Sequence, residues 1–198
     1  MTTSISTSTI VAQAFRYMEA SPIASFDDAS EQAQAAAEQY PNALRLCLEA
    51  ADWSFASVLV HLPEALLTLG VIADPDLPYA YAPPGDAVRL HEVGDFNTAW
   101  RLDRDFLRAD DPAPLRLRYT SLDLNEAQMP ATFRDAVALR LACLLGARWL
   151  TTQSKMQDLE SRAQLQLKTA MRQDARTASQ QRYDDLAQPD DWVSEATR

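Results

Sequence analysis

The sequence predicts an α+β protein that is mainly α: a helical bundle with a small inserted antiparallel β-meander and an extended C-terminal tail. Three observations predict this class. Apolar residues recur at helical spacing near both ends of the chain, residues 86–120 alternate between apolar and polar positions, and the last residues are rich in Asp. The 198 residues therefore divide into one domain, residues 1–180, with the meander at about 86–120, and a tail, residues 181–198.

The composition is that of a globular chain with a strong acidic excess. Hydrophobic residues make up 47% and charged residues 23%, the net charge is −10, and the isoelectric point is near 4.6. A protein that binds nucleic acid by neutralising phosphates needs a basic face, so the acidic excess argues against a nucleic-acid-binding protein of this kind. It remains compatible with a surface that lets DNA pass without binding it.

The N-terminus and the cysteines indicate an intracellular chain. The start, MTTSISTST, has no basic segment followed by an apolar one, and no apolar run reaches the ~18 residues of a membrane span. We therefore expect no membrane association. Cys47 and Cys143 fall in apolar, helical-looking segments, so we expect buried free thiols, with a disulfide as the alternative.

The N-terminal region is expected to be helical. Apolar residues recur at helical spacing over 10–19, and Asp28 with the glutamate three residues later resembles a capping box that starts the Ala-rich helix 29–40. Pro41 interrupts this pattern. Residues 42–52 are therefore either the continuation of a kinked helix or a fresh helix that begins at the proline.

The middle of the chain is expected to hold the strands. In residues 53–78 the apolar residues are too continuous to show either a helical or a strand period, so we expect an extended or irregular segment there. Alternating runs at 86–91, 99–107 and 115–120, with short connections, predict a three-stranded antiparallel meander. In the second run one face holds Trp100, Leu102 and Phe106 and the other holds Arg101, Asp103 and Asp105.

Two helices follow the strands. Pro130 stands where a helix would start, and residues 133–150 are apolar on more than one face, so this helix is buried on several sides or lies at a subunit contact. A long amphipathic helix is expected from about Lys155 to Gln181. The remaining residues, YDDLAQPDDWVSEATR, are expected to form the extended tail.

The sequence offers little catalytic chemistry. The four glycines are too widely spaced for a nucleotide-binding turn, and the two histidines do not form a zinc motif. Asp103 and Asp105 are the most enzyme-like pair, because alternate residues of a strand share a face. Arg116 and Arg118 occupy the same polar phase of the proposed partner strand, however, so cross-strand ion pairs explain the two aspartates more simply. We expect no catalytic residue, no cofactor and no metal ligand.

The tail and an aromatic elbow are the candidate partner-binding segments. Trp192 stands in an otherwise polar end, where it folds back on its own domain, anchors the tail in a partner, or belongs to a disordered terminus. Tyr79 and Tyr81, in YAYAPPGDAVRL, precede two prolines and a glycine, which makes a rigid elbow expected to position the meander against the bundle. The alternative is that both tyrosines only cover the hydrophobic core. The candidate partner-binding residues are Tyr79, Tyr81, Tyr183, Asp190, Asp191, Trp192 and Val193.

Three stretches, taken in order, resemble the head-to-tail adaptor proteins of tailed bacteriophages and gene transfer agents, including the tail tubular protein A family. YAYAPPGDAVRL is similar to the Tyr-x-Tyr-x-x-Pro-x-Asp-x-x-Arg elbow of these proteins, through Tyr79, Tyr81, Pro84, Asp86 and Arg89. EAADWSFAS resembles their Trp-x-Phe-Ala, and LRLRYTSLDLNEAQMPATFRDAVALRLACLLGARWLT resembles their strand, acidic spacer and Leu-Ala helix. The resemblance spans about residues 8–178, with a departure at PPGD and an unusually long interval at 58–78.

The resemblance implies a structural virion protein rather than an enzyme. Such adaptors form a ring, twelve-fold like the portal, that lies in the neck below the portal protein and joins the head to tail or neck proteins. DNA passes through the lumen without specific binding, and assembly takes place in the cytoplasm of the bacterial host. Two alternatives stay open: a carboxylate-dependent metal hydrolase that uses Asp103 and Asp105, and a soluble helical module that binds other proteins.

Overall fold

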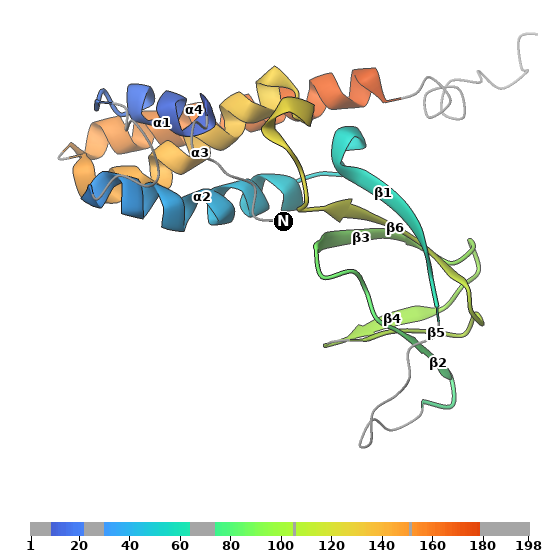
Figure 1. Ribbon diagram of the computed structural model, residues 1–198. Coiled ribbons are helices and arrows are strands. Elements are labelled where there is room, and N and C mark those ends of the chain that lie inside the picture. Colours follow the sequence, from blue (N-terminus) through green and yellow to red (C-terminus); the bar gives the residue numbers. More distant parts are fainter. Residues whose placement is uncertain (1–8, 22–29, 64–73, 105, 151, 179–198) are drawn as a thin grey trace, which may run out of the picture.

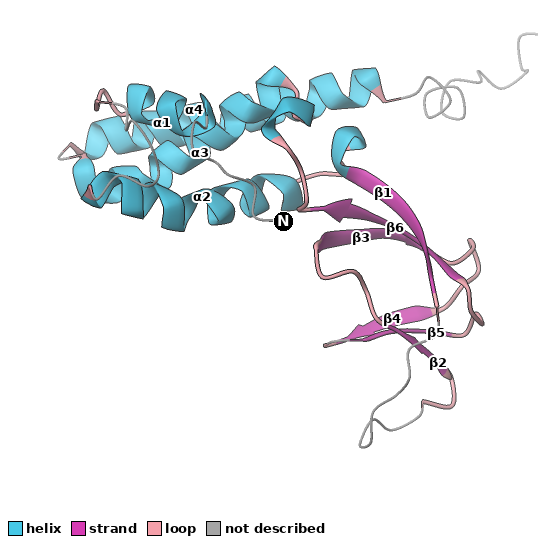
Figure 2. Ribbon diagram, in the orientation of Figure 1, coloured by secondary structure: helices cyan, strands magenta, loops and turns pink. Residues whose placement is uncertain are grey.

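The computed structural model describes residues 9–21, 30–63, 74–104, 106–150 and 152–178 (Figure 1). Four helices form a bundle at one end of the molecule, and two small antiparallel sheets lie at the other end (Figure 2). The helices are α1 (Thr9–Tyr17), α2 (Glu31–Glu49), α3 (Ala131–Trp149) and α4 (Gln153–Thr177). The α+β class, with mainly helical structure, is thus confirmed.

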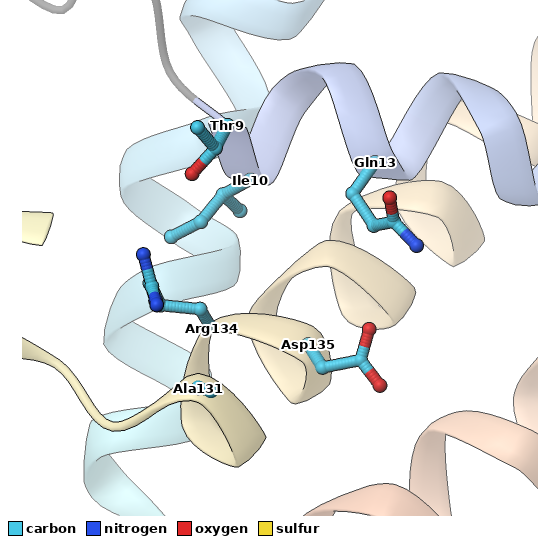
Figure 3. A pocket seen from close by; sticks show the side chains of 6 residues that line it. All are labelled: Thr9, Ile10, Gln13, Ala131, Arg134 and Asp135. Atoms are coloured by element: carbon cyan, nitrogen blue, oxygen red, sulfur yellow. The ribbon is translucent and has the colours of Figure 1, made fainter.

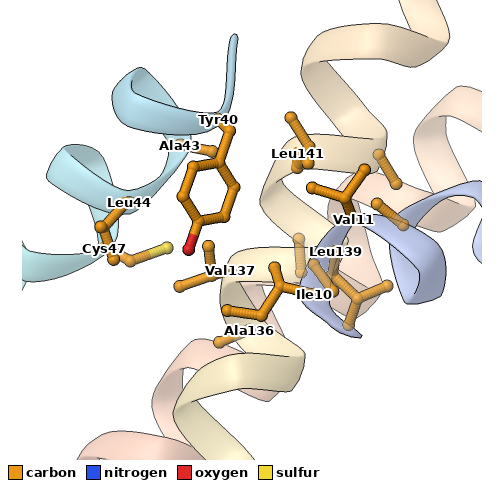
Figure 4. Close-up of a cluster of buried hydrophobic side chains, with 14 of the residues drawn as sticks. Ile10, Val11, Tyr40, Ala43, Leu44, Cys47, Ala136, Val137, Leu139 and Leu141 are labelled. Atoms are coloured by element: carbon orange, nitrogen blue, oxygen red, sulfur yellow. The ribbon is translucent and has the colours of Figure 1, made fainter. Parts of the chain in front are cut away.

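Helix α3 is the centre of the bundle. It packs against α1, α2 and α4, and its buried side chains point to all three neighbours. This arrangement explains why the sequence is apolar on more than one face of this segment. Figure 4 shows the core between α1, α2 and α3, where Tyr40 lies beside Cys47 and Val137.

Helix α2 corrects the expected start of the second helix and decides between the two alternatives at Pro41. It begins after Ser30, whose side chain accepts a hydrogen bond from the Ala33 amide at 3.2 Å, whereas Asp28 lies outside the described residues. The helix then continues through Pro41 to Glu49 as one element rather than two. A proline inside a helix removes one backbone hydrogen bond. Here the apolar residues on both sides of Pro41 pack on α3, and this burial holds the two halves in line.

The six strands form two sheets, not one meander. The first sheet has the order β1 (Ser57–Leu62), β6 (Leu115–Ser121), β3 (Ala87–Val93), and the second has the order β2 (Tyr79–Tyr81), β5 (Phe106–Ala109), β4 (Trp100–Asp103). The run 99–107, expected to be one strand, divides at Arg104, which has a φ of +50°. Such a left-handed residue turns the chain, so β4 and β5 pair as a hairpin, with Phe106 opposite Asp103.

The two sheets enclose a second core. Leu115, Leu117 and Tyr119 of β6 point into it, as their alternation with Arg116 and Arg118 predicts. The facing residues come from β2 and β5 of the second sheet, namely Tyr81, Leu107 and Ala109. Strand β1 falls in the interval 53–78, which was expected to be extended or irregular; residues 64–73 of that interval lie outside the described residues.

An aromatic cluster joins the bundle to the first sheet. Trp53 and Phe55 lie between α2 and β1, and both contact Phe133 of α3 edge to face, with ring centroids 4.7 and 4.8 Å away. The Trp53 indole N–H donates to the Cys47 carbonyl at 2.9 Å, which satisfies its polar group inside the core. Because all three elements meet in these rings, the cluster fixes how the sheet end is attached to the bundle.

Helix α4 is tied to the same place by a buried carboxylate. Asp174 is 8% exposed and accepts hydrogen bonds from the Ser54 amide at 2.8 Å and from the Ser54 hydroxyl at 2.7 Å. Ser54 is the first residue of the short 3₁₀ helix η1 (Ser54–Ala56), which follows Trp53. The last turns of α4 are thereby held against the junction between bundle and sheet.

Removing the ring of Phe133 is expected to destabilise the whole molecule. Phe133 is fully buried, so Phe133→Ala should lower the free energy of unfolding by about 3–5 kcal/mol, measured by urea denaturation. Phe96→Ala removes the same atoms from a fully exposed position and serves as the control, with a change within about 0.5 kcal/mol. Equal effects of the two substitutions would contradict the role of the cluster.

Candidate functional site

The residues that carry the adaptor resemblance converge on the junction. Trp53 and Phe55 come from the second stretch, and Phe133 comes from the third. From the first stretch, Asp86 accepts hydrogen bonds from the hydroxyls of Ser121 and Tyr119, at the end of β6 nearest the bundle. Arg89 donates to the Glu49 carbonyl at the end of α2, at 3.4 Å. Three separate motifs therefore build one structural feature.

The two tyrosines of the elbow serve the second sheet instead. Tyr81 is fully buried in the core between the sheets, and its hydroxyl donates to the Asp111 carbonyl at 2.6 Å. Tyr79 packs partly buried at the margin of that core and keeps some exposed surface. The tyrosines therefore do not set the strands against the bundle, and the burial of Tyr81 confirms the alternative of a core residue. Of the elbow motif, Arg89 bonds to the end of α2 and Asp86 to the end of β6.

The remaining candidate partner-binding residues belong to the C-terminal tail. Residues 179–198 lie outside the described part of the chain, so the structure does not place them. The candidates in that segment are Tyr183, Asp190, Asp191, Trp192 and Val193.

The pairing expected for Asp103 is wrong. The guanidinium of Arg101 contacts both of its carboxylate oxygens, at 2.7 and 2.8 Å, and Arg108 approaches at 3.0 Å. The hydrogen bonds from Arg101 hold the pKa of this carboxyl below its usual value. The arginines expected as partners are used elsewhere: Arg118 pairs with Asp52 and Glu92, and Arg116 approaches Asp95. Asp103 is thus a neutralised carboxylate at a hairpin turn.

No group suited to bind a metal ion is found in the described ranges, where three or more His, Cys, Asp or Glu side chains never converge. Asp105, the second carboxylate of the candidate pair, lies outside those ranges. Both cysteines are free, as expected, but only Cys47 is buried, whereas Cys143 is partly exposed. Burial raises the pKa of the Cys47 thiol to about 12, so at neutral pH this thiol is protonated and a weak nucleophile.

A shallow pocket lies between α1 and α3 (Figure 3). Its volume is about 270 Å³, and Thr9, Ile10 and Gln13 face Ala131, Arg134 and Asp135 across it. Asp135 accepts a hydrogen bond from the Tyr17 hydroxyl. Burial raises the pKa of Tyr17, and this hydrogen bond raises it further. The pocket combines one cation with one already bonded carboxylate. The hydroxyl in its lining, that of Thr9, donates to the Glu126 carboxylate at 3.3 Å.

The second sheet exposes an apolar edge that the sequence did not predict. We define the apolar edge as Phe96, Trp100 and Leu102. Trp100 and Leu102 of β4 stand opposite Ala109 and Leu107 of β5, so they continue the face of the sheet that forms the second core. They nevertheless remain 44% and 50% exposed, and Phe96 is fully exposed. The alternation correctly places Trp100 and Leu102 on one face, but it is wrong for Phe106, which stands opposite Asp103 and so shares the face of that aspartate. The alternation contains no signal that β4 is an edge strand.

Apolar surface of this kind, on a strand with one open edge, is suited to contact with another protein. In the described sheets β4 pairs with β5 alone. Trp and Phe side chains supply large contact areas at low entropic cost and are typical anchors of interfaces.

Comparison with known proteins adds no family to this picture, since neither the protein-family models nor the curated proteins contain a significant match to the chain. Among the helices that the structure describes, none has the length and apolar character needed to cross a membrane.

The surroundings of Asp103 predict that it does not act in metal-dependent hydrolysis. Because two arginines already neutralise this carboxylate, millimolar Mg²⁺ or Mn²⁺ should raise the Tm of neither the unmodified chain nor Asp103→Asn. Asp95→Asn, at a carboxylate that is 89% exposed, is the control for loss of one charge. A metal-dependent rise in Tm that Asp103→Asn alone abolishes would favour the hydrolase.

Proposed function

We propose that this chain is a structural virion protein, a head-to-tail adaptor that assembles as a ring below the portal, joins the head to the tail and continues the DNA channel. The observation that carries the proposal is the convergence of the three resembling stretches. Trp53, Phe133 and Arg89 come from different stretches; the first two rings contact each other, and Arg89 donates to the Glu49 carbonyl at the end of α2, where bundle and sheet meet. A chance likeness of short motifs has no reason to gather its residues at one structural feature.

A ring needs two different surfaces on each protomer, because each copy contacts its neighbours head to tail. The apolar edge is a suitable first surface. Its strand, β4, lies at the sheet end of the molecule, away from the bundle that forms the main core (Figure 1). Contact with a neighbouring copy would remove its exposed Trp and Leu surface from water without any rearrangement of the fold.

The charge of the chain suits a DNA channel. With a net charge of −10 per copy, a ring of copies presents a strongly negative surface. Within roughly a Debye length, about 8 Å at physiological ionic strength, such a surface repels phosphates and keeps DNA from binding in the lumen. The same repulsion argues against specific DNA recognition by this chain.

The tail supplies contacts to the portal protein or to neck and tail proteins. Trp192 would be its anchor, flanked in the sequence by Asp190, Asp191 and Val193, and Tyr183 comes earlier in the tail. Tyr79 is the elbow residue with surface left for a partner. The proposal needs no catalytic residue, cofactor or metal.

The number of copies per particle tests this function. Quantitative mass spectrometry of particles purified from the source should find the chain at a copy number close to that of the portal protein, because a ring that continues the portal has matching symmetry. Finding no more than trace amounts in intact particles would contradict the adaptor function and favour a soluble protein-binding module.

Substitution of the apolar edge should block assembly without unfolding the chain. Trp100→Ser with Leu102→Ser removes exposed apolar area worth about 3 kcal/mol at one interface, so incorporation into particles should fall at least about tenfold. Leu59→Ser, at a leucine that is 59% exposed on β1, is the matched control and should assemble normally. Normal incorporation of the doubly substituted chain would show that the apolar edge lies outside the ring contact.

A further inference from the structure

Helix α4 carries a basic stripe, which we define as Lys168, Arg172 and Arg176. The three residues are spaced four apart, so they follow one another along one side of the helix, and all three are exposed. Leu165 lies one turn before Lys168 and is 66% exposed. The stripe therefore begins beside an exposed apolar side chain and ends at the last turn of α4.

The basic stripe has no acidic partner among the described residues. Elsewhere on α4 the cations are paired: Lys155 contacts Glu19 at 2.7 Å, and Arg162 contacts Asp158 at 3.8 Å. The single acid near the stripe, Asp174, is buried and bonded to Ser54. In a chain of net charge −10, three unpaired cations on one helix side leave a local positive surface that attracts an acidic segment.

The C-terminal segment 183–193 is complementary to the basic stripe both in the sign of its charges and in the order of its charged and apolar residues. It reads YDDLAQPDDWV, with four aspartates and no cation. Following the chain away from α4, two aspartates come first, two more follow, and Trp192 comes next. Following α4 back from its end, Arg176, Arg172 and Lys168 come first, and Leu165 comes next. A tail that reverses direction after α4 therefore sets its aspartates beside the cations and Trp192 beside the exposed leucine.

The tail is long enough for this reversal. Leu165 lies ~18 Å from the end of α4 at 1.5 Å per residue of helix. The fifteen residues from 178 to 192 reach up to ~50 Å when extended, which leaves ample length for a turn. A short covalent tether gives an effective concentration in the millimolar range, well above the concentration of other copies in a dilute solution.

We propose that residues 183–193 of the free chain bind the basic stripe and Leu165 of their own helix α4. This contact is a property of the free chain and does not depend on the adaptor function. If the chain is an adaptor, the contact keeps Trp192 and its aspartates occupied until the portal or a neighbouring copy displaces them, so that the tail engages its partner only during assembly.

Zero-length carbodiimide cross-linking of the full chain tests this contact, because the chain contains just two lysines, Lys155 and Lys168. Peptide mass spectrometry should find Lys168 joined to an aspartate between 184 and 191. Lys155 joined to Glu19 is the internal positive control, since these groups are already 2.7 Å apart. A mixture of unlabelled and ¹⁵N-labelled chains separates links within one chain from links between copies.

Reversing the charge of the stripe is the matched perturbation. Arg172→Glu with Arg176→Glu should lower the yield of the Lys168 link about tenfold, equivalent to about 1.4 kcal/mol, and leave the Lys155 link unchanged. Arg45→Glu with Arg148→Glu changes the net charge equally at two exposed sites away from the stripe and should leave both links unchanged.

Three results would overturn the proposal. The first is formation of the Lys155 link with no Lys168 link to the tail. The second is a Lys168 link found mainly between labelled and unlabelled chains, which would make a second copy the occupant. The third is binding of duplex DNA that removes the Lys168 link and is lost on charge reversal, which would make the stripe a nucleic-acid contact. None of these results bears on the copy number in particles, so the two proposals fail separately.

Discussion

The edge-to-face contact of Trp53 and Phe55 with Phe133 is the interaction on which the rest of the structure depends. These rings come from the segment between α2 and β1 and from α3, so a single buried cluster connects the helical core to the first sheet. Asp174 adds the end of α4 through its two hydrogen bonds to Ser54. The orientation of the sheet end, and with it the position of any partner surface there, follows from this junction.

Features encoded by local pattern could be predicted from the sequence, whereas features set by distant contacts could not. The alternation of Leu115, Leu117 and Tyr119 specifies a buried face whichever strand lies alongside, so that strand and its inward side chains were predicted correctly. Strand order depends on β1, which pairs with β6 from nearly sixty residues away and has no clear period of its own. The single left-handed residue Arg104 was enough to divide one predicted strand into two.

The candidate site shows the same division. The prediction that Asp103 and Asp105 share a face assumes that residues 99–107 form one strand. The chain turns at Arg104 instead, and Asp103 forms ion pairs with Arg101 and Arg108. Trp100 and Leu102 were placed on the correct face, but their exposure follows from β4 being at a sheet edge, which no local pattern reveals. Tyr81 could be read from the sequence either as part of a partner-binding elbow or as a core residue, and its burial follows from the pairing of β2 with β5 in the second sheet.

The account separates the residues that build the protomer from those that join it to others. The rings of the junction are buried and belong to the stretches on which the proposed adaptor function rests. The apolar edge and the basic stripe are exposed, so we expect their substitution to leave the fold unchanged. Cryo-electron microscopy of purified particles, reconstructed around the vertex below the portal, tests the central claim most directly. The account predicts a ring whose subunit density fits the bundle and the two sheets, with β4 against the neighbouring subunit. A neck whose complete density is explained by other proteins would contradict it.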